Sequence, residues 1–198
     1  IIKHGINEMW GQNLDVFHYL MLYNENQQQM PKPEGCDAGI INGAYLIEEV
    51  GEEGPTVRLL SSGPILKYVR EAAQTLCSEY GIQSQVWSVT SYGELRRKGL
   101  EAERSTRLNP QESASSYVAD CFGDRTPTIA ASDYVSSVPE MIQRWVGGRY
   151  VVLGTDGFGR SDTRDALRSF FEIDINSIIV AAISALEQDG KIQSGSVI

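Results

Sequence analysis

Short apolar runs alternate with longer amphipathic stretches from residue 43 to residue 190. Runs such as Tyr150–Gly154 have the β-branched and aromatic composition of buried strands. The stretch 65–80 repeats apolar residues every three or four positions, which is typical of a helix. Parallel strands need long crossover connections, and helices supply them. The alternation therefore predicts an α/β domain in which helices cover both faces of a mostly parallel sheet.

The start of this region departs from the alternation. Strands are expected at 43–50 and 56–61, and the Gly- and Pro-containing loop 51–55 between them predicts a hairpin. The first strand is then antiparallel and lies at an edge of the sheet. The other predicted elements are strands at 85–90, 126–131 and 150–154, and helices at 64–80, 91–100, 138–146, 161–171 with Ser161 as its N-cap, and 175–189 with Asp174 as its N-cap.

The first 39 residues have a different character. Residues 1–10 resemble the back half of a helix that ends at Gly11, and a helix without a visible start indicates a truncated chain. The aromatic-rich run 15–23 predicts a strand buried on both faces. Polar residues and two prolines follow, which disfavour a helix. We therefore expect a linker and a domain boundary in 24–39.

Composition excludes several classes of function. The chain of 198 residues carries 17 basic and 26 acidic side chains, and its formal net charge of −9 has the wrong sign for a general nucleic-acid binder. The longest apolar run, Ile178–Ile183, is far shorter than the ~20 residues that span a bilayer, so no membrane partner is expected. The three cysteines lack metal-site spacing, which fits a reducing cytoplasm.

Ligands of parallel α/β sheets bind outside the carboxyl ends of the strands. Hydroxyl groups and backbone N–H groups at these ends suit an anion, but the same residues also serve as helix caps, and capping is the favoured interpretation. The positions concerned are Ser61–Gly63, Thr90–Ser91, Ser132–Asp133 and Thr155–Gly157.

Conventional catalytic motifs are not recognisable. The glycine order of Gly154–Gly159 is reversed relative to a dinucleotide-binding loop, so a turn is favoured. His18 is expected to be packed or hydrogen-bonded and His4 to be solvated, and neither is assigned a catalytic role. Cys77 is expected to be an inert thiol on a helix face. No catalytic, cofactor-binding or metal-binding residue is therefore predicted in this chain.

Several segments together resemble the carboxyl-terminal region of the bacterial homodimeric pyruvate dehydrogenases. The most specific is Leu153–Asp162, Leu-Gly-Thr-Asp-Gly-Phe-Gly-Arg-Ser-Asp, supported by Leu60–Leu66, Trp87–Ser91 and Ala131–Tyr134. The resemblance implies a three-layer αβα domain of transketolase carboxyl-terminal type, with a mostly parallel sheet and one antiparallel edge strand. It implies that residues 1–24 end the pyrimidine-binding domain, 25–39 form the linker and 40–198 form the carboxyl-terminal domain.

The resemblance also implies a function for the intact protein. Members of the family decarboxylate pyruvate on thiamine diphosphate held by Mg²⁺ and pass the acetyl group to the lipoyl group of a dihydrolipoyl acyltransferase. The family's G-D-G motif for the cofactor is absent from this chain. We therefore expect a cytoplasmic homodimer in which this part supports dimerisation and structure, binds neither thiamine diphosphate nor Mg²⁺, and is inactive alone.

One polar segment is a candidate for the substrate entrance or the dimer interface: Asn24, Glu25 and Asn26. In the transketolases, an arginine that contacts the substrate phosphate corresponds to Asn24. Its replacement fits a substrate without phosphate, such as pyruvate, and disfavours a transketolase. A polar loop end is the simpler interpretation. The alternative for the whole chain is a stand-alone binding module of transketolase carboxyl-terminal type without catalysis.

Overall fold

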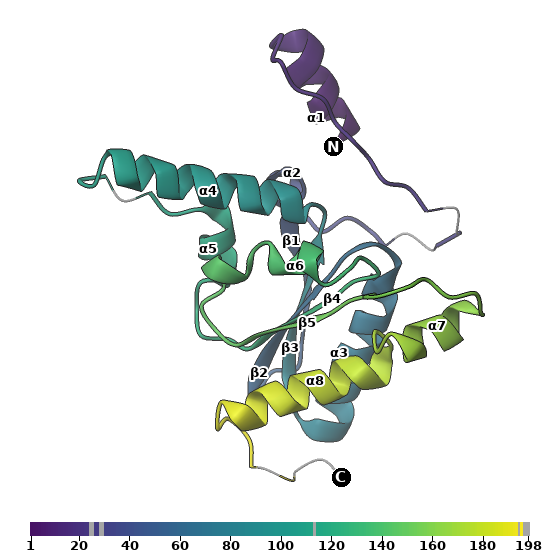
Figure 1. The fold of residues 1–198 in the computed structure, drawn as a ribbon. Coiled ribbons are helices and arrows are strands. Elements are labelled where there is room, and N and C mark those ends of the chain that lie inside the picture. Colours follow the sequence, from purple (N-terminus) through teal and green to yellow (C-terminus); the bar gives the residue numbers. More distant parts are fainter. Residues whose placement is uncertain (24–25, 28–29, 113, 194, 196–198) are drawn as a thin grey trace.

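A computed structural model describes residues 1–23, 26–27, 30–112, 114–193 and 195. Its centre is a sheet of five strands: β1 (Ala44–Val50), β2 (Thr56–Ser61), β3 (Gln83–Val89), β4 (Thr128–Ala131) and β5 (Tyr150–Leu153) (Figure 1). The strand order is β1-β3-β2-β4-β5. Strands β3, β2, β4 and β5 run parallel, and β1 is antiparallel to β3 at one edge.

The predicted hairpin is wrong. β1 pairs with β3, with Ala44 opposite Val89, and β3 lies between β1 and β2. The loop 51–55 therefore joins two strands that are not neighbours, although β1 is antiparallel and at the edge as predicted. A hairpin signal is local, whereas β3 buries apolar residues on both faces and must lie inside the sheet.

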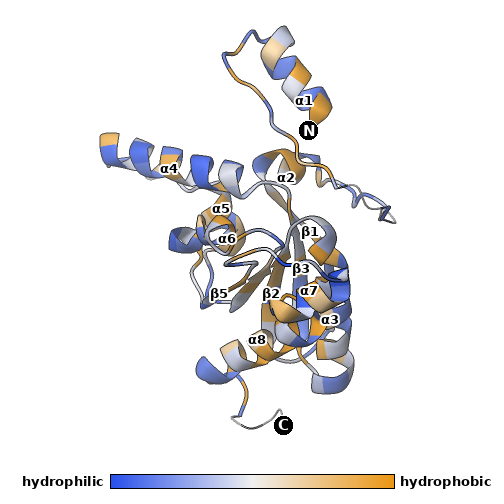
Figure 2. Ribbon diagram, turned by 45° about the vertical axis from the view of Figure 1, so that its right-hand side comes forward, coloured by the Kyte–Doolittle hydropathy of each residue, from blue (hydrophilic) through white to orange (hydrophobic). Residues whose placement is uncertain are grey.

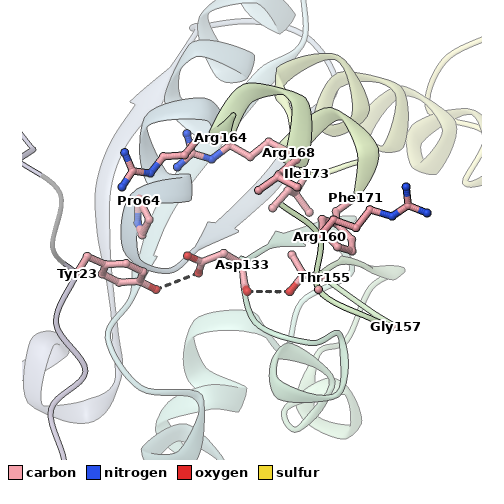
Figure 3. Close-up of a pocket in the computed structure, with 12 residues that line it drawn as sticks. Tyr23, Pro64, Asp133, Thr155, Gly157, Arg160, Arg164, Arg168, Phe171 and Ile173 are labelled. Atoms are coloured by element: carbon pink, nitrogen blue, oxygen red, sulfur yellow. Dashed lines mark hydrogen bonds between the residues drawn. The ribbon is translucent and has the colours of Figure 1, made fainter. Parts of the chain in front are cut away.

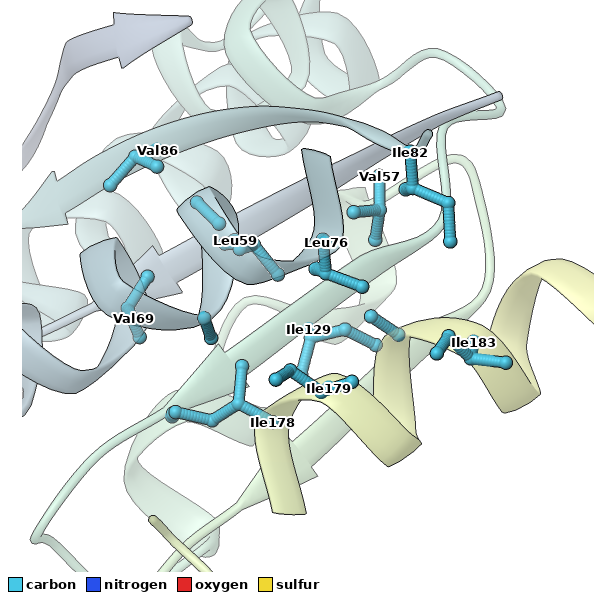
Figure 4. Packing of buried hydrophobic residues seen from close by; sticks show 14 of the residues in the cluster. Val57, Leu59, Val69, Leu76, Ile82, Val86, Ile129, Ile178, Ile179 and Ile183 are labelled. Carbon is cyan, nitrogen blue, oxygen red and sulfur yellow. The ribbon is translucent and has the colours of Figure 1, made fainter. Parts of the chain in front are cut away.

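Helices cover both faces of the sheet, which confirms the three-layer prediction. α3 (Leu66–Tyr80) and α8 (Ile175–Gln188) pack against each other and on one face, around Leu59 and Ile129 (Figure 4). α4 (Tyr92–Leu108) and α5 (Tyr117–Phe122) cover the other face, around Leu60 and Ala130. Adjacent residues of one strand thus enter opposite cores, as the two-residue period of a strand requires.

Several helix ends lie at the caps and glycines that the sequence offers, although α4 continues to Leu108, beyond its predicted end at residue 100. α3 ends at Gly81, whose φ of +63° is the left-handed cap conformation. Asp174 caps α8 by accepting a hydrogen bond from the backbone N–H of Ser177. Ser91 caps α4 through the backbone N–H of Glu94.

Other predicted elements have different bounds. Helix α7 (Arg164–Phe170) is capped by Thr163 and not by Ser161, because the Thr163 side chain accepts from Ala166. The helix predicted at 138–146 is broken into α6 (Ser137–Glu140) and the 3₁₀ turn η3 (Gln143–Trp145). The 3₁₀ turn η2 (Gly63–Ile65) precedes α3. Helix α2 (Asp37–Asn42) begins within the predicted linker, beyond the prolines.

Most of residues 1–23, which we call the arm, lies apart from the sheet (Figures 1 and 2). The predicted helix is present as α1 (Ile2–Ile6), continued by the π-helical turn η1 (Asn7–Gly11). The buried strand predicted at 15–23 is wrong, because this segment is extended but pairs with no strand of the sheet, and most of its side chains are exposed. An apolar run becomes a strand only where a sheet offers an edge to it.

Residues 164–188 together have the length and hydropathy of a possible membrane-spanning helix. They are divided into α7 and α8, and the apolar side of α8, including Ile178, Ala182 and Leu186, is buried against α3 and the sheet. This is the pattern of a core helix in an α/β layer.

Candidate functional site

A pocket of about 340 Å³ opens at the carboxyl edge of the sheet, beside β2, β4 and β5 (Figure 3). The chain leaves β2 toward β3 on one side and leaves β4 toward β5 on the other side. The carboxyl ends of β2 and β4 therefore flank a topological switch point, where ligands of α/β sheets bind. Pro64, just after β2, and Asp133, just after β4, both line the pocket.

Asp133 and Tyr23 meet at the mouth of this pocket. The Tyr23 hydroxyl donates a hydrogen bond of 3.0 Å to Oδ1 of Asp133. Burial raises the pKa of Asp133, although the bond from Tyr23 acts in the opposite direction. Burial and the neighbouring carboxylate also raise the pKa of Tyr23, so its proton stays on the phenol at neutral pH.

Close packing holds Tyr23 in this place. Gly63 has φ of +56°, and a Cβ atom at this residue would lie 2.8 Å from the hydroxyl oxygen of Tyr23 and 2.9 Å from two atoms of its ring. Residue 63 therefore has to be glycine for both its backbone conformation and this contact. The hydroxyl of Tyr134 donates to Sδ of Met21 at 3.5 Å and adds a second contact between the arm and the domain.

Three arginines from the end of the chain line the pocket: Arg160, Arg164 and Arg168. Arg164 and Arg168 extend toward Pro64, whereas Arg160 extends away from it and stacks over Phe170 at 3.9 Å (Figure 3). Arg168 donates a hydrogen bond to the Tyr68 hydroxyl and also lies over that ring.

The remaining polar residues predicted at the strand ends have separate structural tasks. Ser62 and Ser132 share a buried hydrogen bond of 2.7 Å, and Thr155 donates to the backbone carbonyl of Asp133 at 2.8 Å. Thr90 donates to the carbonyl of Ile40, away from the pocket.

Asp156 accepts hydrogen bonds from the backbone N–H and the hydroxyl of Ser136, and these bonds lower the pKa of Asp156. The capping and turn interpretation therefore holds for Thr90–Ser91 and Asp156, but Asp133, Thr155 and Gly157 line a pocket.

The two histidines do not line this pocket. Nε2 of His18 is 2.8 Å from one carboxylate oxygen of Glu8, and Nε2 of His4 is 3.4 Å from the other oxygen. Both histidines therefore make contacts within the arm. The prediction of a hydrogen-bonded His18 is confirmed. Asn26 is exposed, while Asn24 and Glu25 lie outside the described residues.

Sequence reasoning found Asp133 but missed Tyr23 and the arginines. Tyr23 was hidden because residues 15–23 resemble a buried strand. Arg164 and Arg168 are four residues apart within the predicted helix 161–171, a spacing that places side chains on one helix face. That spacing was the available signal.

The fold and the pocket at its switch point define a class of protein, and a family model identifies it. Residues 43–174 match the model of the transketolase-like TK C-terminal domain. The chain belongs to this family. A transketolase from Pichia stipitis has the same fold, with a TM-score of 0.54 and 17% identity over 83% of this chain and 21% of that one. A transketolase from Leishmania mexicana gives 0.52 and 18% over 81% of this chain and 20% of its own length.

Within this family, the curated relatives are pyruvate dehydrogenase E1 components. The relative from Pseudomonas aeruginosa is 47% identical over 98% of this chain, and that from Haemophilus influenzae is 44% identical over 98%. The relative from Escherichia coli is 41% identical over 97%. The chain spans 22% of the length of each of these relatives. The resemblance drawn from the sequence is confirmed.

Proposed function

We propose that this chain is part of a pyruvate dehydrogenase E1 component, which decarboxylates pyruvate on thiamine diphosphate and transfers the acetyl group to the lipoyl group of an acyltransferase. The observation that carries the proposal is the 47% identity to the Pseudomonas aeruginosa E1 component over 98% of the chain. That span includes the arm as well as the domain, so the arm is a shared part of the protein and not a chance extension.

The role we propose for this part is dimerisation and structural support in a cytoplasmic homodimer. The arm exposes large apolar side chains: Phe17 is 85% exposed and Leu22 is 90% exposed. Several large apolar side chains exposed along one segment are typical of an interaction site. In the intact enzyme, the rest of the pyrimidine-binding domain and the second protomer of the dimer would cover this surface. The net charge of −9 suits a basic segment of the acyltransferase.

The described residues do not fit the cofactor's metal site. They contain no group of three or more His, Cys, Asp or Glu side chains placed to hold a metal ion. Mg²⁺ bound to a diphosphate needs oxygen ligands in octahedral geometry, and the pocket offers one carboxylate, that of Asp133, hydrogen-bonded to Tyr23. We therefore propose that thiamine diphosphate and Mg²⁺ bind to another part of the enzyme and that this chain alone is inactive.

Asn24, Glu25 and Asn26 remain our candidates for the substrate entrance or the dimer interface. They directly follow Tyr23, which is anchored at the edge of the sheet. A full-length Glu25→Ala enzyme is expected to raise the KM for pyruvate, and Glu52→Ala, in the exposed loop after β1, is the matched control. Unchanged KM and kcat in the Glu25→Ala enzyme would support the simpler interpretation, in which this segment is only a polar loop end.

The mass of the native protein tests the proposal. Denaturing electrophoresis of source-cell extract, probed with an antibody against this chain, is expected to show a band several-fold heavier than 21.9 kDa. The protein purified with that antibody is expected to decarboxylate pyruvate when thiamine diphosphate and Mg²⁺ are supplied. A band at 21.9 kDa without activity would instead favour the stand-alone binding module.

A further inference from the structure

Asp133 is fixed on two sides at the point where the chain leaves β4. The Thr155 hydroxyl donates to the backbone carbonyl of Asp133 at 2.8 Å. The buried hydroxyl of Ser132 accepts a hydrogen bond of 3.2 Å from the backbone N–H of Tyr134, so a side chain closes the turn around Asp133. The Asp133 carboxylate is therefore presented by a backbone with little freedom, which a precise contact requires.

Tyr23 packs on the domain more closely than the tyrosine four positions before it. Tyr23 is 44% exposed, whereas Tyr19 is 80% exposed. The Tyr23 hydroxyl points toward the Asp133 carboxylate and donates its hydrogen bond there (Figure 3). Its ring and hydroxyl also lie where any side chain at Gly63 would clash with them. The domain thus fixes the last residue of the arm.

The fixed residue lies directly before the candidate entrance segment 24–26. Consecutive Cα atoms are about 3.8 Å apart, so fixing residue 23 limits how far the next residues can extend from it. The contact also lies at the switch point of the sheet, the edge where ligands of α/β sheets bind. The hydrogen bond between Tyr23 and Asp133 therefore joins this edge to the segment that we propose for substrate entry.

We propose that Tyr23 and Asp133 are positioning residues for pyruvate binding in the intact enzyme. Their hydrogen bond sets where the arm ends on the domain, and the segment 24–26 carries this position to the substrate entrance. Neither side chain is assigned a contact with pyruvate. Loss of the bond therefore weakens substrate binding and leaves the chemical step nearly unchanged. The inference rests on the proposed function, because it needs pyruvate as the substrate.

Steady-state decarboxylation of pyruvate by the full-length enzyme, with saturating thiamine diphosphate and Mg²⁺, tests the proposal. Tyr23→Phe removes the donor and Asp133→Ala removes the acceptor. Each is expected to raise the KM for pyruvate about fivefold, the ratio for the loss of one hydrogen bond, with kcat unchanged. Tyr19→Phe removes a hydroxyl from an exposed residue of the arm and is the matched control, with KM and kcat expected to be those of the wild type.

Two further variants show whether the hydrogen bond itself is responsible. Asp133→Asn keeps an amide oxygen that can accept from Tyr23, so its KM is expected to stay within about twofold of the wild type. The double variant Tyr23→Phe/Asp133→Ala breaks the same bond as either single variant. Its KM is therefore expected to equal theirs and not the product of the two effects.

The outcomes separate this inference from the proposed function. An active wild-type enzyme whose KM is unchanged in Tyr23→Phe and Asp133→Ala would overturn the positioning role and leave the proposed function intact. A fall in kcat at constant KM, an Asp133→Asn enzyme as impaired as Asp133→Ala, or multiplied effects in the double variant would overturn the role as well. A full-length wild-type protein that does not decarboxylate pyruvate would overturn the proposed function, and this inference with it. Circular dichroism shows that each variant is folded.

Discussion

The arm and the α/β domain contain the same kinds of apolar residue, but they bury them to very different extents. Leu22 of the arm is 90% exposed, whereas Leu59 of β2 is completely buried between α3 and α8. The difference is not in local sequence, because both residues lie in short apolar runs. Burial needs a second layer, and the domain supplies two layers of helices while the described residues place none over the arm.

A matched pair of leucine truncations gives the largest expected difference. Leu59→Ala is expected to lower the free energy of unfolding by about 2–5 kcal/mol because it leaves a cavity in a packed core. Leu22→Ala removes the same atoms from an exposed position and is expected to cost less than about 0.5 kcal/mol. Urea unfolding monitored by circular dichroism measures both. A large loss in Leu22→Ala would show that the arm is packed in solution.

A second pair compares ion pairs of the domain and the linker. Arg58 is 2% exposed, and its guanidinium donates to Asp124 at 2.8 Å. Asp124→Ala is expected to cost about 1–3 kcal/mol, because the buried cation loses its charged partner. Asp37→Ala breaks the exposed pair with Lys32 and is expected to cost under about 0.5 kcal/mol. Equal losses in urea unfolding would mean that Arg58 is solvated.

The contact between the arm and the domain can be loosened at Tyr23. Tyr23→Phe keeps the ring and removes the hydrogen bond to Asp133, which is worth about 1 kcal/mol. We expect limited proteolysis to cut the arm several-fold faster, with the midpoint of global unfolding nearly unchanged. Tyr19→Phe, at an exposed residue of the same segment, is the control. If the two variants are cut at the same rate, Tyr23 does not anchor the arm.

The smallest expected effect is a pH dependence at Asp133. Its pKa is raised in the folded state by burial, so folding favours the protonated form. The stability that this group contributes is present below the unfolded pKa and is lost as the pH rises through the folded pKa. Asp133→Asn is therefore expected to gain stability relative to the wild type between acid and neutral pH. A constant difference between their urea midpoints would contradict the raised pKa.

The elements that the sequence predicted well are those whose ends carry their own signals. Helix α8 was found with its Asp174 cap because an apolar stripe, a cap and a glycine agree. Pairing between strands is decided by partners far along the chain. The turn-rich loop 51–55 therefore predicted that β1 pairs with β2, whereas β1 pairs with β3. Tyr23 and Asp133 are 110 residues apart in sequence, and no local pattern could bring them together.

The position of β1 also imposes an order on folding. It cannot form its ladder until β3 exists, since Val50 pairs with Ser84 and Ala44 pairs with Val89. During synthesis β1 leaves the ribosome first but must wait for more than about thirty further residues, which takes seconds at typical elongation rates. Its unpaired backbone is meanwhile available to other chains. A chaperone that shields residues 44–50 during this delay would raise the yield of folded protein. It would bind a segment that is accessible only before β3 has formed.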